Sequence, residues 1–140
     1  MKNVLLHICC GVCASSVIKK LQEENFHIIG FFYNPNISCK NEYKKRMESV
    51  YKVSQIFKID LIIGEYNYDK WFDLTKDLKK EPEGKIRCQI CYKMRLKETY
   101  EKLQELKISH FATTLGISPH KDTLVINKIG EELDKEAFLQ

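Results

Sequence analysis

The amino-acid sequence predicts an α/β fold, a Rossmann-like parallel sheet of about four to five strands with helices on both faces. Apolar segments typical of buried strands alternate along the chain with segments whose apolar residues recur at helical spacing. Such alternation implies parallel strands joined by right-handed crossovers. The 140 residues suit one domain, and no repeat, low-complexity tract or interdomain linker divides them. We therefore expect residues 1–140 to form a single α/β domain.

Four segments have the composition of buried strands. Val4–Ile8 is a nearly continuous apolar run, as a strand covered on both faces should be. His27–Tyr33 has the same pattern and ends at a turn-forming NPN sequence at 34–36. Leu61–Ile63 and Ser109–Thr113 are shorter strands. The loops after parallel strands gather at one edge, where ligands bind, so residues after Thr113 should face the loop after Ile8 if the first and fourth strands are neighbours.

Five helices fit the remaining segments. Ser15 or Ser16 can cap a first helix that runs to about Asn25. A polar loop, Lys79–Lys85, separates the third helix from the fourth. The other four helices are expected at residues 41–58, 68–78 and 92–106 and from about Thr123.

Composition limits the class of protein. No apolar run approaches the roughly 20 residues that a membrane span needs, and the run at the start is too short for a signal peptide. We therefore expect a cytoplasmic protein, in which clustered cysteines are more often metal ligands or redox catalysts than structural disulfides. The net charge of +4 permits an RNA partner without requiring one.

Five of the six cysteines fall into two clusters. Cys9, Cys10 and Cys13 follow the first strand directly, whereas Cys88 and Cys91 must fold back from the loop before the fourth helix. Thiolates are soft ligands, so two clusters brought together favour zinc or an iron–sulfur centre. The vicinal pair Cys9–Cys10 argues against an ordinary zinc ribbon, whose paired ligands have two or more residues between them.

The residues alone also allow two other interpretations of the cysteines. A structural zinc site with four cysteine ligands has the right ligand type. The Cys10–Cys13 segment also has the spacing of a thioredoxin motif, where a helix N-terminus lowers the pKa of a thiol, but this leaves Cys9, Cys88 and Cys91 without a role. Cys39 lies outside both clusters and is expected to be a small buried apolar side chain.

Other polar residues surround the same loops. His7 lies in a buried strand and is expected to be a core histidine, not a ligand. The hydroxyl and imidazole groups that follow the fourth strand suit either capping of the last helix or binding of phosphate or substrate. Basic residues that would each be an ordinary solvated charge flank the NPN turn and the second cysteine pair, and together they are compatible with a surface that faces RNA: Lys40, Lys44, Lys45, Arg46, Lys85, Arg87, Lys93 and Arg95.

Four motifs in this order and spacing, over nearly the whole chain, resemble the QueH family of epoxyqueuosine reductases. They are LHICCGVC at 6–13, YNPNI at 33–37 with Glu42, Tyr43 and Arg46 after it, GKIRCQICY at 84–92 with Arg95 and Leu96, and TTL at 113–115 with SPHK at 118–121. The resemblance implies that the Rossmann-like sheet is of the HUP type.

The resemblance also implies an activity. In the last step of queuosine biosynthesis, an epoxide on the cyclopentane ring of a modified tRNA wobble base is reduced to an alkene, so epoxyqueuosine becomes queuosine. Removal of the oxygen takes two electrons and two protons. An iron–sulfur site that receives electrons from an unknown donor suits this oxidoreductase chemistry. The implied partner is tRNA, whose anticodon loop presents the base outside its stack.

Site residues follow from the same resemblance. Cys9, Cys10, Cys88 and Cys91 match the ligands of one [4Fe-4S] cluster, and Cys13 is placed to hold one additional iron beside it. The expected substrate-binding residues are Asn34, Asn36, Arg46, Arg87, Arg95, Thr114, Ser118, His120 and Lys121.

One departure from the family bears on activity. Family members continue to a C-terminal tyrosine–cysteine–glycine–cysteine segment with two redox-active cysteines, which is absent from this sequence ending at Gln140. If the five clustered cysteines all hold metal, none remains near the site as a free redox pair. We expect the 140-residue form to assemble the cluster pocket but to turn over poorly or not at all.

Overall fold

The computed structural model describes residues 2–37, 39–76, 86–117 and 123–140, and their side chains except at residues 75, 86–88 and 117. Its centre is a four-stranded sheet in the order β3-β2-β1-β4, in which every pairing is parallel. The strands are β1 (Lys2–His7), β2 (Phe26–Phe32), β3 (Asp60–Ile63) and β4 (His110–Thr113). The predicted fold class is confirmed, and the first and fourth strands are neighbours, which is the condition under which residues after Thr113 were expected to face the loop after Ile8.

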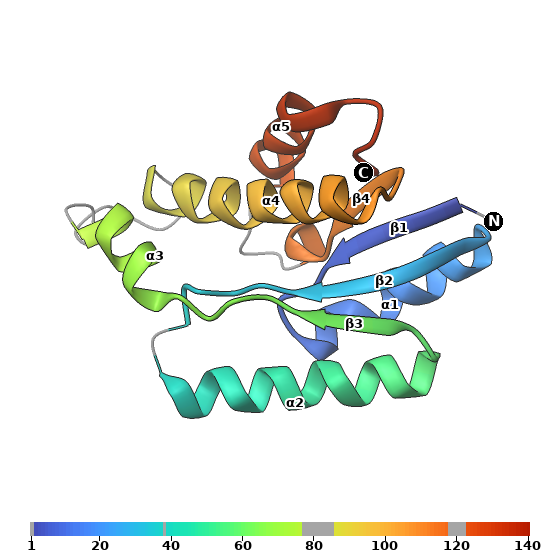
Figure 1. Cartoon of the computed structure of the whole chain (residues 1–140), viewed down its shortest axis with the longest axis horizontal. Helices are drawn as coiled ribbons and strands as arrows, with labels where there is room; N and C mark the ends of the chain where they lie inside the picture. Colours follow the sequence, from blue (N-terminus) through green and yellow to red (C-terminus); the bar gives the residue numbers. More distant parts are fainter. Residues whose placement is uncertain (1, 38, 77–85, 118–122) are drawn as a thin grey trace.

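Helices cover both faces of this sheet (Figure 1). On one face, α1 and α2 pack against the strands, and on the other lies α4 with α5 beyond it. The helices are α1 (Gly11–Glu23), α2 (Lys40–Phe57), α3 (Tyr68–Thr75), α4 (Ile86–Leu106) and α5 (Thr123–Asp134), with a 3₁₀ helix at Leu115–Ile117. None of them, within the described residues, is long and apolar enough to cross a membrane.

Alternate residues of the strands enter two different cores, as side chains on a pleated strand must. Leu6 packs with Ile18 of α1 in the core beneath α1 and α2. Leu5 packs with Phe111 in the core beneath α4. Because both sets are almost wholly buried, β1 is apolar on both faces, which explains its continuous apolar run.

The order of strands reverses at β1. The chain proceeds from β1 outward through β2 and β3, and then crosses back to place β4 on the other side of β1. The carboxyl end of β1 is therefore the switch point at which doubly wound sheets bind ligands. At the outer edge of β4, the Phe111 N–H donates to the Ala137 carbonyl at 3.0 Å and the Leu139 N–H donates to the Phe111 carbonyl at 2.9 Å, so the segment around Phe138 extends the sheet.

The start of α1 differs from the prediction. The helix begins at Gly11, and Ser15 does not cap it but donates a hydrogen bond from within it to the Gly11 carbonyl at 3.3 Å. Cys10 occupies the N-cap position in an extended conformation without a side-chain cap. At this first helical position α2 approaches so closely that a Cβ on residue 11 would lie 2.3 Å from Ser49 Oγ, so glycine fits there and a larger residue requires a shift.

The start of α4 was also predicted wrongly. The helix begins at Ile86, six residues before the predicted Tyr92, so Cys88 and Cys91 belong to its first turns and not to a preceding loop. Residues 86–91 contain no glycine or proline that would stop a helix. Positions 88 and 91 are three residues apart and therefore lie on one side of α4.

The third helix ends earlier than expected, at Thr75, and the predicted end at Leu78 and the loop Lys79–Lys85 lie outside the described residues. Its first turn is capped by Asn67, whose side-chain oxygen accepts a hydrogen bond from the Lys70 N–H at 3.1 Å.

Candidate metal centre

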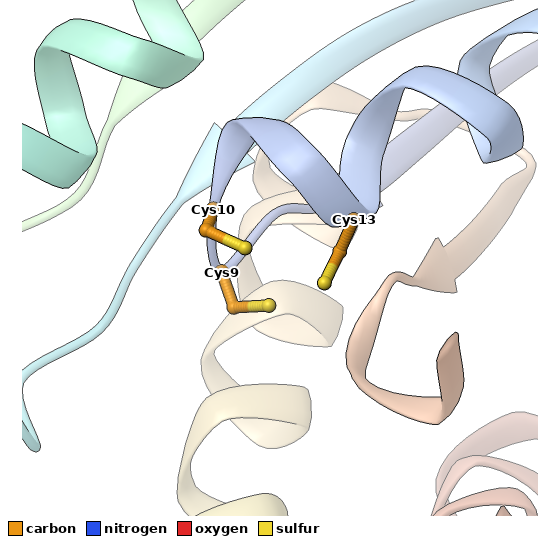
Figure 2. A group of neighbouring side chains, drawn as sticks. All are labelled: Cys9, Cys10 and Cys13. Atoms are coloured by element: carbon orange, nitrogen blue, oxygen red, sulfur yellow. The ribbon is translucent and has the colours of Figure 1, made fainter. Parts of the chain in front are cut away.

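Three cysteines meet at the carboxyl end of β1. The sulfur atoms of Cys9, Cys10 and Cys13 all lie within 4.8 Å of one another, and each residue is half-buried. Figure 2 shows their side chains directed into one space beside the first turn of α1. Cys9 leaves the end of the strand, Cys10 caps the helix and Cys13 is three residues further on, so local geometry alone brings the sulfurs together.

Cys9 is held by the end of β4. Its backbone N–H donates to Thr114 Oγ1 at 3.2 Å, and its sulfur lies 3.4 Å from the same oxygen. Thr114 is fully buried, and its own N–H donates to the His7 carbonyl at 3.0 Å. The predicted approach of the segment after the fourth strand to the first cysteine cluster is therefore confirmed at Thr114.

The NPN turn forms another wall of the site. Asn34 is buried, and its side-chain nitrogen donates to the Ile8 carbonyl at 3.0 Å, one residue before Cys9. Its side-chain oxygen accepts a hydrogen bond from Arg95 Nη1 at 3.1 Å. The Oδ1 atom of Asn36 is also buried and has no hydrogen-bond partner among the described residues. Two predicted site residues, Asn34 in the turn after β2 and Arg95 on α4, are thus joined next to the residue that precedes Cys9.

His7, at the end of β1, is hydrogen-bonded to Thr113 of β4 and to Tyr33, which directly follows β2. Its Nε2 donates to the Tyr33 carbonyl at 2.9 Å, so its Nδ1 accepts from the Thr113 hydroxyl at 3.0 Å. Burial, together with the nearby charge of Arg95, lowers the pKa of His7 to about 3, although the bond to Tyr33 opposes this. His7 is therefore a neutral core histidine, as predicted, and both ring nitrogens are engaged.

Cys10 and Cys13 differ in acidity. Burial raises the pKa of Cys13 to about 12, and hydrogen bonding to Cys10 and the negative charge of its neighbours add to this. Burial also works against ionisation of Cys10, but the N–H of Cys13 and the neighbouring thiols lower the pKa of Cys10 overall. The charge of Arg46 acts in the same direction.

This donor set fits a soft metal. Sulfur ligands about 2.3 Å from one tetrahedral metal stand about 3.8 Å apart, and the three sulfurs here lie within 4.8 Å of one another. Metal binding deprotonates the thiols, and the charge of the metal would offset the burial and the neighbouring negative charge that raise the pKa of Cys13. Cys9, Cys10 and Cys13 can therefore hold a metal ion together.

The second cysteine cluster lies at the same end of the sheet. Cys91 is buried in α4. The next residue, Tyr92, belongs to a core cluster with Leu96 of α4 and Leu115, against which Cys9 packs. Cys91 lies outside the group of three close sulfur atoms, and the side chain of residue 88 lies outside the described part of the chain.

The remaining residues predicted from the sequence lie outside the group of three close cysteines. Arg46 on α2 is half-exposed and donates from Nε to Glu42 Oε1 at 2.9 Å. Arg87 lies in the first turn of α4, and its side chain is outside the description. Cys39 is exposed at the N-cap of α2, so its predicted burial is wrong; a helix cap beside a turn has no core to face. The predicted residues Ser118, His120 and Lys121 lie outside the described residues.

The close approach of Gly11 and Ser49 places α2 beside the cysteines, and it was not predicted from the sequence. Glycine between two cysteines was the available signal, because a glycine at a helix start permits close approach of another backbone. No sequence signal indicated Ser49.

Comparison with known proteins identifies the family. The sequence profile of "Epoxyqueuosine reductase QueH" matches residues 4–140. This chain belongs to the QueH family of epoxyqueuosine reductases. Relatives of that name come from Thermotoga maritima, 35% identical over 139 residues, Histophilus somni, 35% over 128, and Helicobacter pylori, 39% over 121.

The alignments cover most of this chain but less of the relatives. They include 97%, 91% and 85% of this chain, in that order, against 70%, 53% and 33% of the relatives' own lengths. The chain thus spans 70% of the Thermotoga QueH protein and about half of the one from Histophilus. All the cysteines of the candidate metal centre lie within the part of the chain that matches the QueH family.

Proposed function

We propose that this chain reduces epoxyqueuosine to queuosine at the wobble position of tRNA through an iron–sulfur site. The observation that carries the proposal is the meeting of Cys9, Cys10 and Cys13 at the switch point of the sheet, in a chain of the QueH family. A reductase needs an electron carrier at its site, and clustered thiolates are the ligands that iron–sulfur centres use.

The proposed ligands of a [4Fe-4S] cluster are Cys9, Cys10, Cys88 and Cys91, with Cys13 for one additional iron. In favour of this set, both cysteine clusters belong to elements that pack together around Cys9. When bound, such a centre supplies the electrons that reduction of an epoxide to an alkene consumes. Thr114 and Asn34 hold the backbone around Cys9 and so keep the ligand loop in place.

The proposed substrate enters as a base turned out of the tRNA anticodon loop. Arg46 is half-exposed and close enough to influence the pKa of Cys10, so it can contact an anionic group near the thiols. Arg87 is proposed to contact tRNA from α4, and Asn36, Ser118, His120 and Lys121 complete the proposed binding surface. Contacts between arginine or lysine and phosphate make the affinity fall steeply with salt.

The test begins with anaerobic purification, visible absorption, and iron and sulfide analysis. We expect iron and sulfide together, and conversion of epoxyqueuosine in tRNA when a chemical reductant is present. Binding to tRNA should weaken as salt is raised. Stoichiometric zinc without sulfide would instead support a structural site, and binding insensitive to salt would contradict the tRNA surface.

A second candidate function rests on the unequal acidity of two thiols. Cys10 at the start of α1 has a lowered pKa, whereas that of Cys13 is raised, as in a thioredoxin-like pair with one nucleophilic thiol. A dithiol reductase of this kind would reduce insulin disulfides with no iron present. It would leave the third sulfur, that of Cys9, without a function although it lies equally close, so we rank it second.

A further inference from the structure

Arg95 is a buried charge without a counter-charge among the described residues. It is 3% exposed, its Nε has no hydrogen-bond partner there, and none of the ion pairs of the described residues includes it. Within the described part of the chain, its side chain donates a hydrogen bond to the neutral amide oxygen of Asn34. Arginine remains protonated in proteins, and an uncompensated buried charge is strongly destabilising. The guanidinium therefore implies an anionic group that this site acquires.

The position of Arg95 indicates which group that is. It follows Cys91 by four residues, so both lie on one side of α4. Asn34, which binds the guanidinium, also binds the Ile8 carbonyl next to Cys9. Arg95 thus lies in the wall that joins the two cysteine clusters.

We propose that Arg95 is a positioning residue whose charge compensates the cysteine thiolates of the bound metal centre and raises its reduction potential. The inference rests on the metal centre of the proposed function. Metal ligation converts the thiols to thiolates, and the potential of an iron–sulfur centre depends on net charge, burial and hydrogen bonds. A nearby fixed cation favours the reduced, more negative state. Asn34 suits this role because an amide orients the guanidinium without neutralising it.

The test compares Arg95→Gln and Arg95→Lys with the unchanged chain after anaerobic loading with iron and sulfide. Optical redox titration should give a lower midpoint potential for Arg95→Gln and a value near the original for Arg95→Lys. Cobalt(II), used as a second probe, should bind Arg95→Gln about 10- to 100-fold more weakly, the usual effect of losing a partner outside the ligand set. Lys102→Gln is the matched control, because it removes the same charge further along α4, where Lys102 pairs with Glu105.

A second variant acts without altering Arg95. Asn34→Asp places a carboxylate against the guanidinium and should lower the midpoint potential in the same direction; it decides the question if Arg95→Gln fails to fold by circular dichroism. Unchanged potential and cobalt affinity in folded variants would overturn the role of Arg95 alone. Absence of metal binding in the unchanged chain would overturn the metal centre and this inference together. No tRNA is used, so failure of the reductase assay is a separate result.

Discussion

Thr114 is the side chain through which β4 holds the metal-binding loop. Replacement by valine keeps the shape but removes the oxygen that accepts the Cys9 N–H. Because a buried donor is then left unpaired, we expect a loss of about 1–3 kcal/mol in unfolding free energy of the metal-free chain and weaker cobalt(II) binding. Denaturant titration and metal titration measure the two effects.

Thr99→Val is the matched control for that change, because Thr99 is equally buried but donates to the Arg95 carbonyl within its own helix. Its stability loss should be smaller, since the main-chain N–H groups around Cys9 keep their partners. Equal losses of cobalt affinity in both variants would contradict a specific role for Thr114.

The thiols should also differ in reactivity. The lowered pKa of Cys10 gives it more thiolate near neutral pH, whereas the pKa of Cys13, about 12, keeps that thiol protonated through the same range. In the metal-free chain at pH 8, we expect iodoacetamide to modify Cys10 before Cys13, with Cys13 gaining reactivity only as the pH rises toward its pKa. Mass spectrometry of digested samples gives the order, and modification of Cys13 first would contradict it.

Bound metal should protect both thiols of this pair, and its removal by a chelator should restore their reaction. The exposed Cys39 provides the internal control, because it lies at the start of α2 and outside the group of three close sulfurs. Its rate should not depend on the metal.

At the scale of elements, the contact between α1 and α2 fixes the first turn of α1. A Cβ at residue 11 would meet Ser49 Oγ at 2.3 Å and the Ser49 carbonyl oxygen at 3.1 Å. Gly11→Ala must push the helices apart, and we expect it to cost about 1–3 kcal/mol of unfolding free energy and to weaken metal binding. Gly116→Ala is the control, since its Cβ would meet Thr123 at an ordinary 3.6 Å. A stabilised Gly11→Ala chain would refute the close packing.

The elements also show what the sequence can and cannot predict. Continuous apolar runs identified β1 and β2, because strands buried on both faces need them. The start of α1 was missed because Cys10 occupies the N-cap position without a side-chain cap, whereas serine is a usual signal for that position. The bond between Asn34 and Arg95 joins residues 61 positions apart, and no local pattern indicates such a pairing. The cysteine trio was predictable in position because strand end and helix start are adjacent in the chain.

For the whole molecule, a metal centre with ligands from both cysteine clusters would connect two elements on different sides of the site. Cys91 lies on α4 outside the close trio, yet α4 packs on Cys9 through the cluster around Tyr92. A centre that includes Cys91 would tie the loop after β1 to α4 across the sheet. Metal that binds only the folded chain raises its stability by mass action, so loading should raise the melting temperature of the entire domain.

We expect Cys91→Ser to reduce bound iron and sulfide as strongly as Cys9→Ser does, and to abolish most of the rise in melting temperature on loading. Serine is nearly isosteric but a poor ligand for soft metals, so the metal-free melting temperatures should change little. Cys39→Ser, at an exposed position, should leave both the metal content and the thermal shift unchanged. If Cys91→Ser kept its full metal content while Cys9→Ser lost bound metal, the centre would be confined to the loop after β1. The two halves of the site would then be linked through the packing of α4 on Cys9 and through the hydrogen bonds of Asn34 to Ile8 and Arg95.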